Sequence, residues 1–411
     1  MRNPRAFWVI GISGLIAFAA GSVRTSASAP TEPNVAVHAA SGLPRPVAFV
    51  QAGAAATPPP SGTFAPRTFT VLGAGDILLH QGLWRQGLAD AKTADRKGYY
   101  FDPIFASAEP RIQAADLAIC HMETPYGPAN GPFKGFPVFA VPPSIAQTIH
   151  DVGYDTCSTA SNHSLDDGQS GIDRTLNDLD AAGVKHTGTA RSAAEAATPD
   201  ILDVKGVKVA QLSYAYGFNG IPLPSGKPWL ANLIDVKNIL AAAARAKADG
   251  AEVVIVSLHW GTQYQEAPNE MQKSIAKQLL ASPDVDLILG CHAHVVQPFQ
   301  KINGKWVVYG MGNQIATQGF SQATMDGVMP EFTFTEVTPG HFQITKAEAI
   351  PTYDKLSSPI SLIDLPAAMA KPGLSASAKA TYERAWKHTK SAVDSMGAAK
   401  DGLIVMSPGS S

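Results

Sequence analysis

The chain has 411 residues, of which 45% are hydrophobic and 16% are charged. This composition supplies a sizeable apolar core and excludes a chain that is disordered throughout. The formal net charge of -2 argues against nucleic acid as the main partner.

The first 66 residues have the composition of a leader and a linker. Two arginines precede the apolar run AFWVIGISGLIAFAAG, so residues 1–29 are predicted to be a signal peptide or an N-terminal anchor. Ala27-Ser28-Ala29 fits a cleavage site, but Pro30 follows it, so an earlier cleavage site and an uncleaved membrane tether both stay open. Residues 30–66, rich in Pro, Ala, Gly and Ser, are predicted to be a disordered linker. We therefore expect an extracytoplasmic protein, secreted or anchored to the cytoplasmic membrane by its N-terminal segment.

From residue 68 onward, strand-like and helix-like segments alternate, which indicates a layered α/β protein. Strands are predicted at 68–75, 116–120, 154–159, 207–214, 251–259, 286–290 and 305–312, and helices at 142–153, 171–183, 235–250 and 267–282. The segments 331–338 and 341–350 are predicted to be antiparallel, in a second or mixed sheet.

The C-terminal region has little strand character. Residues 356–405 are predicted to be a helical extension in which Tyr382, Trp386 and Val393 share one face of an amphipathic helix. We expect that helix to pack on the sheets, with a contact surface for a membrane partner as the alternative. Residues 406–411 are predicted to be a disordered tail.

Three cysteines, Cys120, Cys157 and Cys291, lie in or at the end of strand-like runs. We interpret them as buried thiols that act as small hydrophobic side chains. A Cys120–Cys291 disulfide stays open, provided that the two strand ends are neighbours in space.

Polar residues follow five of the predicted strands. They are Asp76, the pair His121 and Glu123, the pair Asn162 and His163, His259, and the pair His292 and His294. Ligands of α/β sheets bind at the carboxyl ends of strands, and neutral imidazole binds divalent transition metals. The pattern therefore predicts one shared site.

Six segments carry a resemblance to a known family. GDILLH, HMETP, STASNHSLDDGQSGIDRTLNDLDAAGV, SLHWGTQY, LILGCHAHVVQP and VVYGMGN, in this order between residues 68 and 313, resemble the CapA family of capsule and poly-γ-glutamate synthesis, within the calcineurin-like metallophosphoesterase superfamily. The resemblance implies a four-layer α/β/β/α sandwich of metallophosphoesterase type over residues 67–355. It implies an exported protein of exopolymer synthesis with a metal-dependent, hydrolase-type site. The alternative is a non-catalytic polymer-binding or assembly subunit that keeps this fold. The implied partner is an anionic surface polymer or its synthesis machinery.

The same resemblance implies residue roles. Asp76 and His294 would bind one metal ion, Glu123 would bridge, and Asn162, His259 and His292 would bind a second ion. His163 would be the catalytic histidine that binds no metal. His121 and Asn313 would support ligands or substrate, although His121 could instead be exposed. One or two divalent ions suit this ligand set, with Mn, Fe or Zn as candidates.

The chain departs from the superfamily pattern at three positions. Leu78 stands where the standard pattern has a histidine, Glu123 replaces an aspartate, and Gln263 stands where relatives often have a glutamate. One ion would thereby lose a ligand, which His80 could replace.

The remaining polar and aromatic residues have structural interpretations. We expect Trp260 and Tyr264 to be packing residues, with a role as substrate platforms as the alternative. We expect Asp166 and Asp167 to shape a loop and cap the next helix, with contact to metal or substrate as the alternative. The histidines outside the motifs are expected to be structural: His38, His150, His186, His341 and His388.

Overall fold

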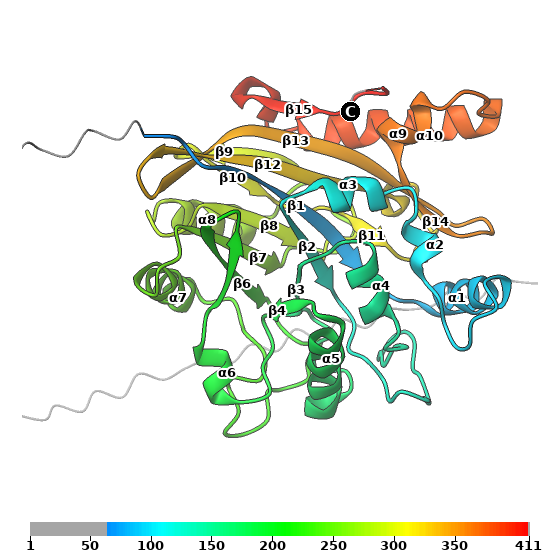
Figure 1. The fold of residues 1–411 in the computed structure, drawn as a ribbon, viewed down its shortest axis with the longest axis horizontal. Helices are drawn as coiled ribbons and strands as arrows, with labels where there is room; N and C mark the ends of the chain where they lie inside the picture. Colours follow the sequence, from blue (N-terminus) through cyan, green and yellow to red (C-terminus); the bar gives the residue numbers. More distant parts are fainter. Residues whose placement is uncertain (1–63, 410–411) are drawn as a thin grey trace, which may run out of the picture. The chain divides into compact units, whose positions relative to one another are not determined.

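The computed structural model describes residues 64–409 (Figure 1). The predicted signal region and nearly all of the predicted linker lie outside the described residues. Within residues 64–409, no helix is both long and apolar enough to cross a membrane.

Two β-sheets form the centre of the fold. The larger sheet has the order β14-β13-β12-β1-β2-β3-β4, with β11 beside β1 and β15 beside β13. Its strands are β1 (Thr68–Ile77), β2 (Leu117–Met122), β3 (Thr156–Ser158), β4 (Lys185–Thr187), β11 (Asn313–Ile315), β12 (Asp326–Thr338), β13 (His341–Lys355), β14 (Ser361–Asp364) and β15 (Leu403–Val405). The smaller sheet has the order β5-β6-β7-β8-β10-β9. Its strands are β5 (Asp200–Val204), β6 (Val207–Ala215), β7 (Val253–His259), β8 (Leu287–Cys291), β9 (Phe299–Ile302) and β10 (Lys305–Val308).

Alternation along the strands explains why the sheets stack. Val71 of β1 and Ile255 of β7 belong to one apolar cluster between the sheets, while the adjacent Leu72 and Val254 face the outer layers. Side chains point to opposite faces with a period of two, so a strand of consecutive apolar residues is buried on both faces. Every residue of β7 is buried.

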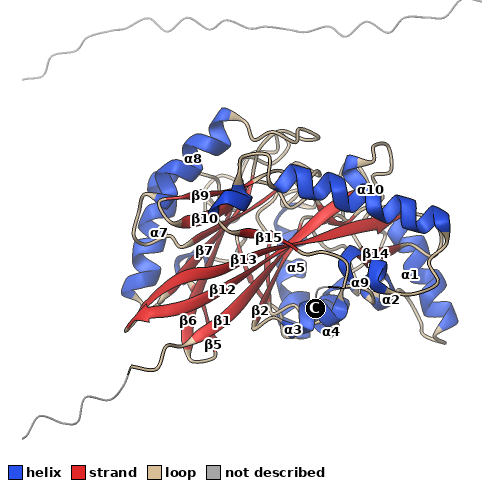
Figure 2. Ribbon diagram, turned by 90° about the horizontal axis from the view of Figure 1, so that it is seen from above, coloured by secondary structure: helices blue, strands red, loops and turns tan. Residues whose placement is uncertain are grey.

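Helices cover both outer faces, which completes four layers. The helices are α1 (Gln81–Thr93), α2 (Asp102–Phe105), α3 (Glu109–Ala114), α4 (Ile145–Asp151), α5 (Gly168–Ala182), α6 (Ala193–Ala197), α7 (Val236–Ala248), α8 (Glu270–Leu280), α9 (Leu365–Ala370) and α10 (Ala376–Val393), with short 3-10 turns at Ala323–Met325 and Ala398–Asp401. Figure 2 shows α7 and α8 on one side of the sheets and α1 to α5 on the other. The predicted α/β/β/α layering is confirmed, and so are the mixed sheet and the four predicted helices, each with ends shifted by a few residues.

The C-terminal region differs from the prediction because part of it joins the larger sheet. β14 pairs with β13 in antiparallel fashion and β15 pairs with β13 in parallel. Helix α10 packs on β12 and β13 with Tyr382 and Val393 buried, as expected from their spacing. The expectation that the chain is unstructured from Met406 is wrong at its first residue, because Met406 is buried and its N–H donates to Ala349 O over 2.9 Å. Strands of three or four residues are too short to show a period, which is why the sequence pattern misses them.

Two of the three cysteines are not the buried thiols that the sequence suggested. Cys120 of β2 and Cys157 of β3 lie opposite each other in register and form a disulfide with a Cα–Cα distance of 4.5 Å. Cys291 is a free, buried thiol. The open Cys120–Cys291 pairing is wrong because Cys120 faces the outer helical layer, whereas Cys291 faces the space between the sheets.

Candidate metal centre

The carboxyl ends of β1, β2, β7 and β8 and the loop after β3 bring the predicted site residues together. Asp76 of β1 lies opposite His121 of β2 in the larger sheet, and His259 of β7 lies opposite Cys291 of β8, one residue before His292, in the smaller sheet. All seven residues predicted as ligands or as the catalytic histidine are buried: Asp76, Glu123, Asn162, His163, His259, His292 and His294. Contacts between their side chains place them in one cluster, and their individual roles stay a prediction.

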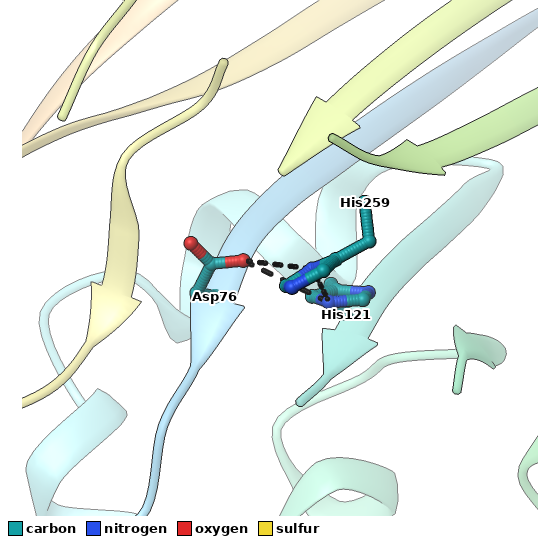
Figure 3. A group of neighbouring side chains, drawn as sticks. All are labelled: Asp76, His121 and His259. Atoms are coloured by element: carbon teal, nitrogen blue, oxygen red, sulfur yellow. Dashed lines mark hydrogen bonds and ion pairs between the residues drawn. The ribbon is translucent and has the colours of Figure 1, made fainter. Parts of the chain in front are cut away.

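The first group of potential ligand atoms comes from Asp76, His121 and His259 (Figure 3). His121 Nε2 lies 2.9 Å from His259 Nδ1 and 3.7 Å from Asp76 Oδ1, and His259 Nδ1 lies 4.0 Å from the same oxygen. Two nitrogens on one tetrahedral ion with bonds of about 2.1 Å are separated by roughly 3.4 Å. One ion therefore fits this group with small side-chain shifts. The alternative that His121 is exposed is wrong, since it is buried in this group.

A second group comes from Asp76, Glu123 and His294. His294 Nδ1 lies 3.1 Å from Asp76 Oδ2, and His294 Nε2 lies 3.7 Å from Glu123 Oε1. Asn313 Oδ1 lies 3.0 Å from His294 Nδ1 and so restrains the ring, while its predicted role beside a metal ligand stays a prediction.

The second ring nitrogen of His259, Nε2, faces a further set of potential ligand atoms. His259 Nε2 lies 2.8 Å from Asn162 Oδ1, 3.0 Å from His292 Nδ1 and 4.0 Å from Glu123 Oε1. Glu123 therefore stands between His294 on one side and His259 on the other. This is where a bridging carboxylate would stand.

Glu123 gives the clearest sign that the cluster fits a cation. Both of its carboxylate oxygens are buried, and neither accepts a hydrogen bond from any described residue. A buried carboxylate without a partner is costly, and a metal ion is one of the few groups that offsets that cost.

Burial sets the charge state of the imidazoles. It lowers the pKa of His121 to about 4 and that of His292 to about 3, and it lowers the pKa of His259 well below its usual value. Neutral imidazole is the form that binds metal ions. Burial raises the pKa of Glu123 to about 7. His294 is the exception: burial opposes its charge, but Glu123 and Asp76 outweigh burial and raise its pKa to about 9.

The backbone is strained where it presents the paired histidines. His292 and His294 have φ values of 95° and 55°, a region that non-glycine residues rarely occupy. The His292 N–H donates to both oxygens of Asp76 over 3.2 Å, which holds the turn in place. Strain of this kind is concentrated at functional sites, where the surrounding structure maintains it.

The loop after β3 supplies a histidine with its own carboxylate. His163 Nδ1 lies 2.7 Å from Asp166 Oδ2, and the same oxygen accepts the Phe139 N–H over 2.7 Å. The expected capping role is therefore wrong for Asp166. It is also wrong for Asp167, which occupies the N-cap position of α5 without a capping hydrogen bond and instead pairs with Lys134 and Arg174.

Asn219 is a neighbour that sequence reasoning missed. Its Oδ1 accepts from Asn162 Nδ2 over 3.0 Å, and its Nδ2 lies 3.4 Å from His163 Nδ1. It lies in a loop after β6 that contains none of the motifs. Asn219 precedes Gly220, and Asn-Gly is a turn signal that agrees with its φ of 49°, but that signal does not connect the turn with the site.

Neither Leu78 nor His80 belongs to the two groups of potential ligand atoms. Leu78 is buried among the outer-layer core residues, so it provides no ligand. His80 lies outside both groups of potential ligand atoms, with its Nδ1 3.4 Å from the Thr317 N–H, and burial lowers its pKa to about 4. His121, rather than His80, stands beside Asp76.

The prediction that Trp260 and Tyr264 are packing residues is confirmed for only one of the two. Trp260 is fully buried and donates to Tyr309 O over 2.9 Å, so it is a packing residue as predicted. Tyr264 is 47% exposed with its ring 5.9 Å from that of His294, so its interpretation as a packing residue is wrong.

Comparison with known proteins identifies the family. Residues 70–318 match the family described as bacterial capsule synthesis protein PGA_cap. The chain belongs to this family. It is 27% identical over 312 residues to the PGA biosynthesis protein CapA of Bacillus subtilis, which covers 72% of this chain and 76% of the relative. It is 26% identical over 246 residues to the capsule biosynthesis protein CapA of Bacillus anthracis, which covers 57% of this chain and 58% of that relative's length. The predicted family is confirmed.

Solved structures show more distant similarity. The calcineurin-like phosphoesterase YfkN from Bacillus subtilis is 15% identical with a TM-score of 0.43, covering 79% of this chain and 98% of that chain. The NAD nucleotidase of Haemophilus influenzae is 12% identical with a TM-score of 0.43, covering 84% of this chain and 65% of that chain. Likeness at this level carries no functional weight.

Proposed function

We propose that this member of the capsule synthesis family is an exported, metal-dependent hydrolase that cleaves a phosphoester or a related linkage during exopolymer synthesis. The observation that carries the proposal is Glu123, whose buried carboxylate accepts no hydrogen bond from the described residues although imidazoles and Asp76 surround it. The names of the Bacillus relatives support capsule or poly-γ-glutamate synthesis as the setting.

Two sets of side chains would hold ions. Asp76 and His294 form one set, with His121 beside Asp76, and Asn162, His259 and His292 form the other, with Glu123 between them. Mixed carboxylate, amide and imidazole donors suit Mn, Fe or Zn. When bound, such ions polarise a phosphoryl oxygen and lower the pKa of a bound water toward neutrality.

His163 would move a proton in this reaction. The Asp166 carboxylate lies 2.7 Å from Nδ1, where it fixes the orientation of the ring. Nε2 makes no hydrogen bond with the described residues, so it can donate a proton to the departing oxygen of the substrate. Asn219 and Phe139 restrain the ring from two further directions.

Export is part of the proposal and is supported by the sequence of residues 1–66. The basic, apolar start and the Pro/Ala-rich linker would place the domain outside the cytoplasmic membrane, next to an anionic surface polymer or its synthesis machinery. Fractionation combined with protease treatment of intact cells tests this. A domain protected from protease and recovered in the cytosol would overturn it.

The hydrolase proposal is tested by metal content and turnover together. Purified protein loaded with Mn, Fe or Zn is assayed against a panel of phosphomonoesters and phosphodiesters, beside Glu123→Gln. We expect Glu123→Gln to lose bound metal and turnover, because it removes the bridging charge and keeps the shape. Glu270→Gln, at a side chain that is 91% exposed on α8, is the matched control and should behave as wild type.

The rival is a non-catalytic assembly subunit, and one observation favours it: Leu78 is a core residue where the standard pattern has a ligand. Fully metal-loaded wild-type protein that cleaves nothing in the panel would favour that rival.

A further inference from the structure

Exposed aromatic side chains gather around the candidate metal centre. Among the described residues, the strongly exposed aromatic side chains are Phe64, Phe136, Tyr216, Tyr264 and Phe320. Four of these five border the histidine cluster, directly or through one intervening ring. Large exposed apolar groups that cluster at one place mark a binding surface more often than those that are scattered singly.

Tyr216 and Tyr264 contact the potential metal ligands themselves. The ring centroid of Tyr216 lies 4.6 Å from that of His292 and 6.4 Å from that of His259, nearly parallel to the latter. The Tyr264 ring lies 5.9 Å from His294. If a reacting group sat on these histidines, the atoms next to it would therefore lie near the two tyrosine rings.

Phe320 and Phe136 each reach the histidine cluster through one intervening ring. Phe320 is 66% exposed and stands at 88° to Tyr264, with 5.0 Å between the centroids. Phe136 is 76% exposed and contacts Phe139, which packs edge-on against His163.

Tyr264 is held in place rather than being loosely exposed. Its φ is 64°, which is unusual for a bulky residue, and its N–H donates over 2.8 Å to Ala293 O, between the two histidines. The backbone that strains His292 and His294 thus also fixes Tyr264. An exposed ring on a strained, anchored backbone is preorganised for a ligand.

Two cations close to the His163 loop are already paired with a carboxylate. Lys134, in the loop before α4, and Arg174, in α5, both pair with Asp167. The border of the site therefore selects by ring contact more than by ion pairing.

We infer that Tyr216, Tyr264 and Phe320 bind a flat ring of the substrate, either an aromatic ring or the apolar face of a pyranose, next to the bond that is cleaved. The inference rests on the proposed hydrolase function and names its substrate class. The perpendicular Tyr264–Phe320 pair forms a corner that offers one face and one edge to a planar group, the two geometries that ring pairs prefer. A linear aliphatic chain gains nothing from such a corner beyond its buried area.

The test compares three phosphomonoesters that differ beside the phosphate: phenyl phosphate, glucose 1-phosphate and glycerol phosphate. Each is assayed with wild type, Tyr216→Ala, Tyr264→Ala and Phe320→Ala. We expect KM for at least one ring-bearing substrate to rise roughly 3- to 10-fold in each variant, the range that one ring–ring contact supplies. KM for glycerol phosphate and the bound metal should not change. The ring-bearing substrate whose KM rises shows whether the site binds an aromatic ring or a sugar.

Two controls accompany the series. Tyr264→Phe keeps the ring and should restore the wild-type KM. Ile404→Ala removes an exposed apolar side chain on β15 and should leave all three substrates unaffected. Equal losses on all three substrates, or no loss on either ring substrate, would overturn the inference.

Binding separates failure of the inference from failure of the proposed hydrolase. Phenylphosphonate and methylphosphonate are titrated calorimetrically into metal-loaded protein. Tighter phenylphosphonate binding that the tyrosine variants abolish, without turnover of any ester, supports the ring site and contradicts the hydrolase. Turnover without a ring preference contradicts the ring site alone.

Discussion

The Nδ1 atom of His294 lies 3.1 Å from Oδ2 of Asp76, and this contact joins the carboxyl end of β8 in the smaller sheet to that of β1 in the larger sheet. Two strands more than two hundred residues apart in sequence thus meet at one buried charge pair. The candidate metal centre is therefore built by the packing of the two sheets against each other.

Alanine variants of the histidines should differ in metal content according to the role of each histidine. His292→Ala and His294→Ala each remove a potential ligand and should lower the bound metal measured by inductively coupled plasma spectrometry. His163→Ala should keep the wild-type metal content and change only substrate turnover, because Asp166 rather than a ligand position fixes its ring. Equal metal content in wild type and in all three variants would show that His292 and His294 are not ligands.

Asn313 should tune the site without supplying an ion-binding atom. Its Oδ1 lies 3.0 Å from His294 Nδ1, and its Nδ2 donates to Thr324 O over 2.9 Å. Replacing a residue that orients a ligand weakens metal affinity by about 10- to 100-fold. Asn313→Ala should therefore bind the same number of ions at saturation but with this weaker affinity in a chelator competition. A lower stoichiometry at saturation would contradict that role.

The Cys120–Cys157 disulfide should stabilise the fold, since it closes a loop between residues separated by 37 positions. Loop-closure entropy for this length predicts a loss of about 3–4 kcal/mol when the bond is removed. The Cys120→Ala/Cys157→Ala variant should unfold at lower denaturant than wild type, whereas Cys291→Ala serves as the control that keeps the bond. Thiol titration of denatured, unreduced protein should find one free thiol. Finding three would contradict the pairing.

His388 should make stability depend on pH. Its Nδ1 lies 2.8 Å from Asp326 Oδ2, and that hydrogen bond raises the pKa of His388 above its ordinary value of 6.5. The protonated form is favoured by folding, so its contribution is fully present below pH 6.5 and is lost as pH rises through the folded pKa. Denaturation of wild type and His388→Gln from pH 5.5 to 8.5 should show the two curves converging with rising pH. A gap that stays constant or widens with rising pH would refute this.

The sequence predicts the layers and most of the site because both depend on short-range pattern. The apolar runs of β7 and β8 end at His259 and just before His292, so strand ends and candidate ligands can be located together. The carboxyl ends of parallel strands lie at the same edge of a sheet, which is why the residues at those ends converge.

What the sequence did not predict depends on register and tertiary contact. The disulfide requires Cys120 and Cys157 to lie opposite each other across β2 and β3, and nothing in either strand specifies that register. The pairing of Asp166 with His163 depends on the turn of the loop, and the exposure of Tyr264 depends on a hydrogen bond to Ala293 from a distant strand end. The polar signature of His121 was visible, but its place beside Asp76 follows only from the β1–β2 register.

The central claim is that Glu123, Asp76 and the buried histidines hold metal. X-ray diffraction from crystals of the purified protein, recorded at the absorption edge of the metal that copurifies, tests it most directly. We expect one or two anomalous peaks within about 2.5 Å of the carboxylate and imidazole atoms of Asp76, Glu123 and His294. Bound metal whose anomalous peaks all lie away from these side chains would contradict it.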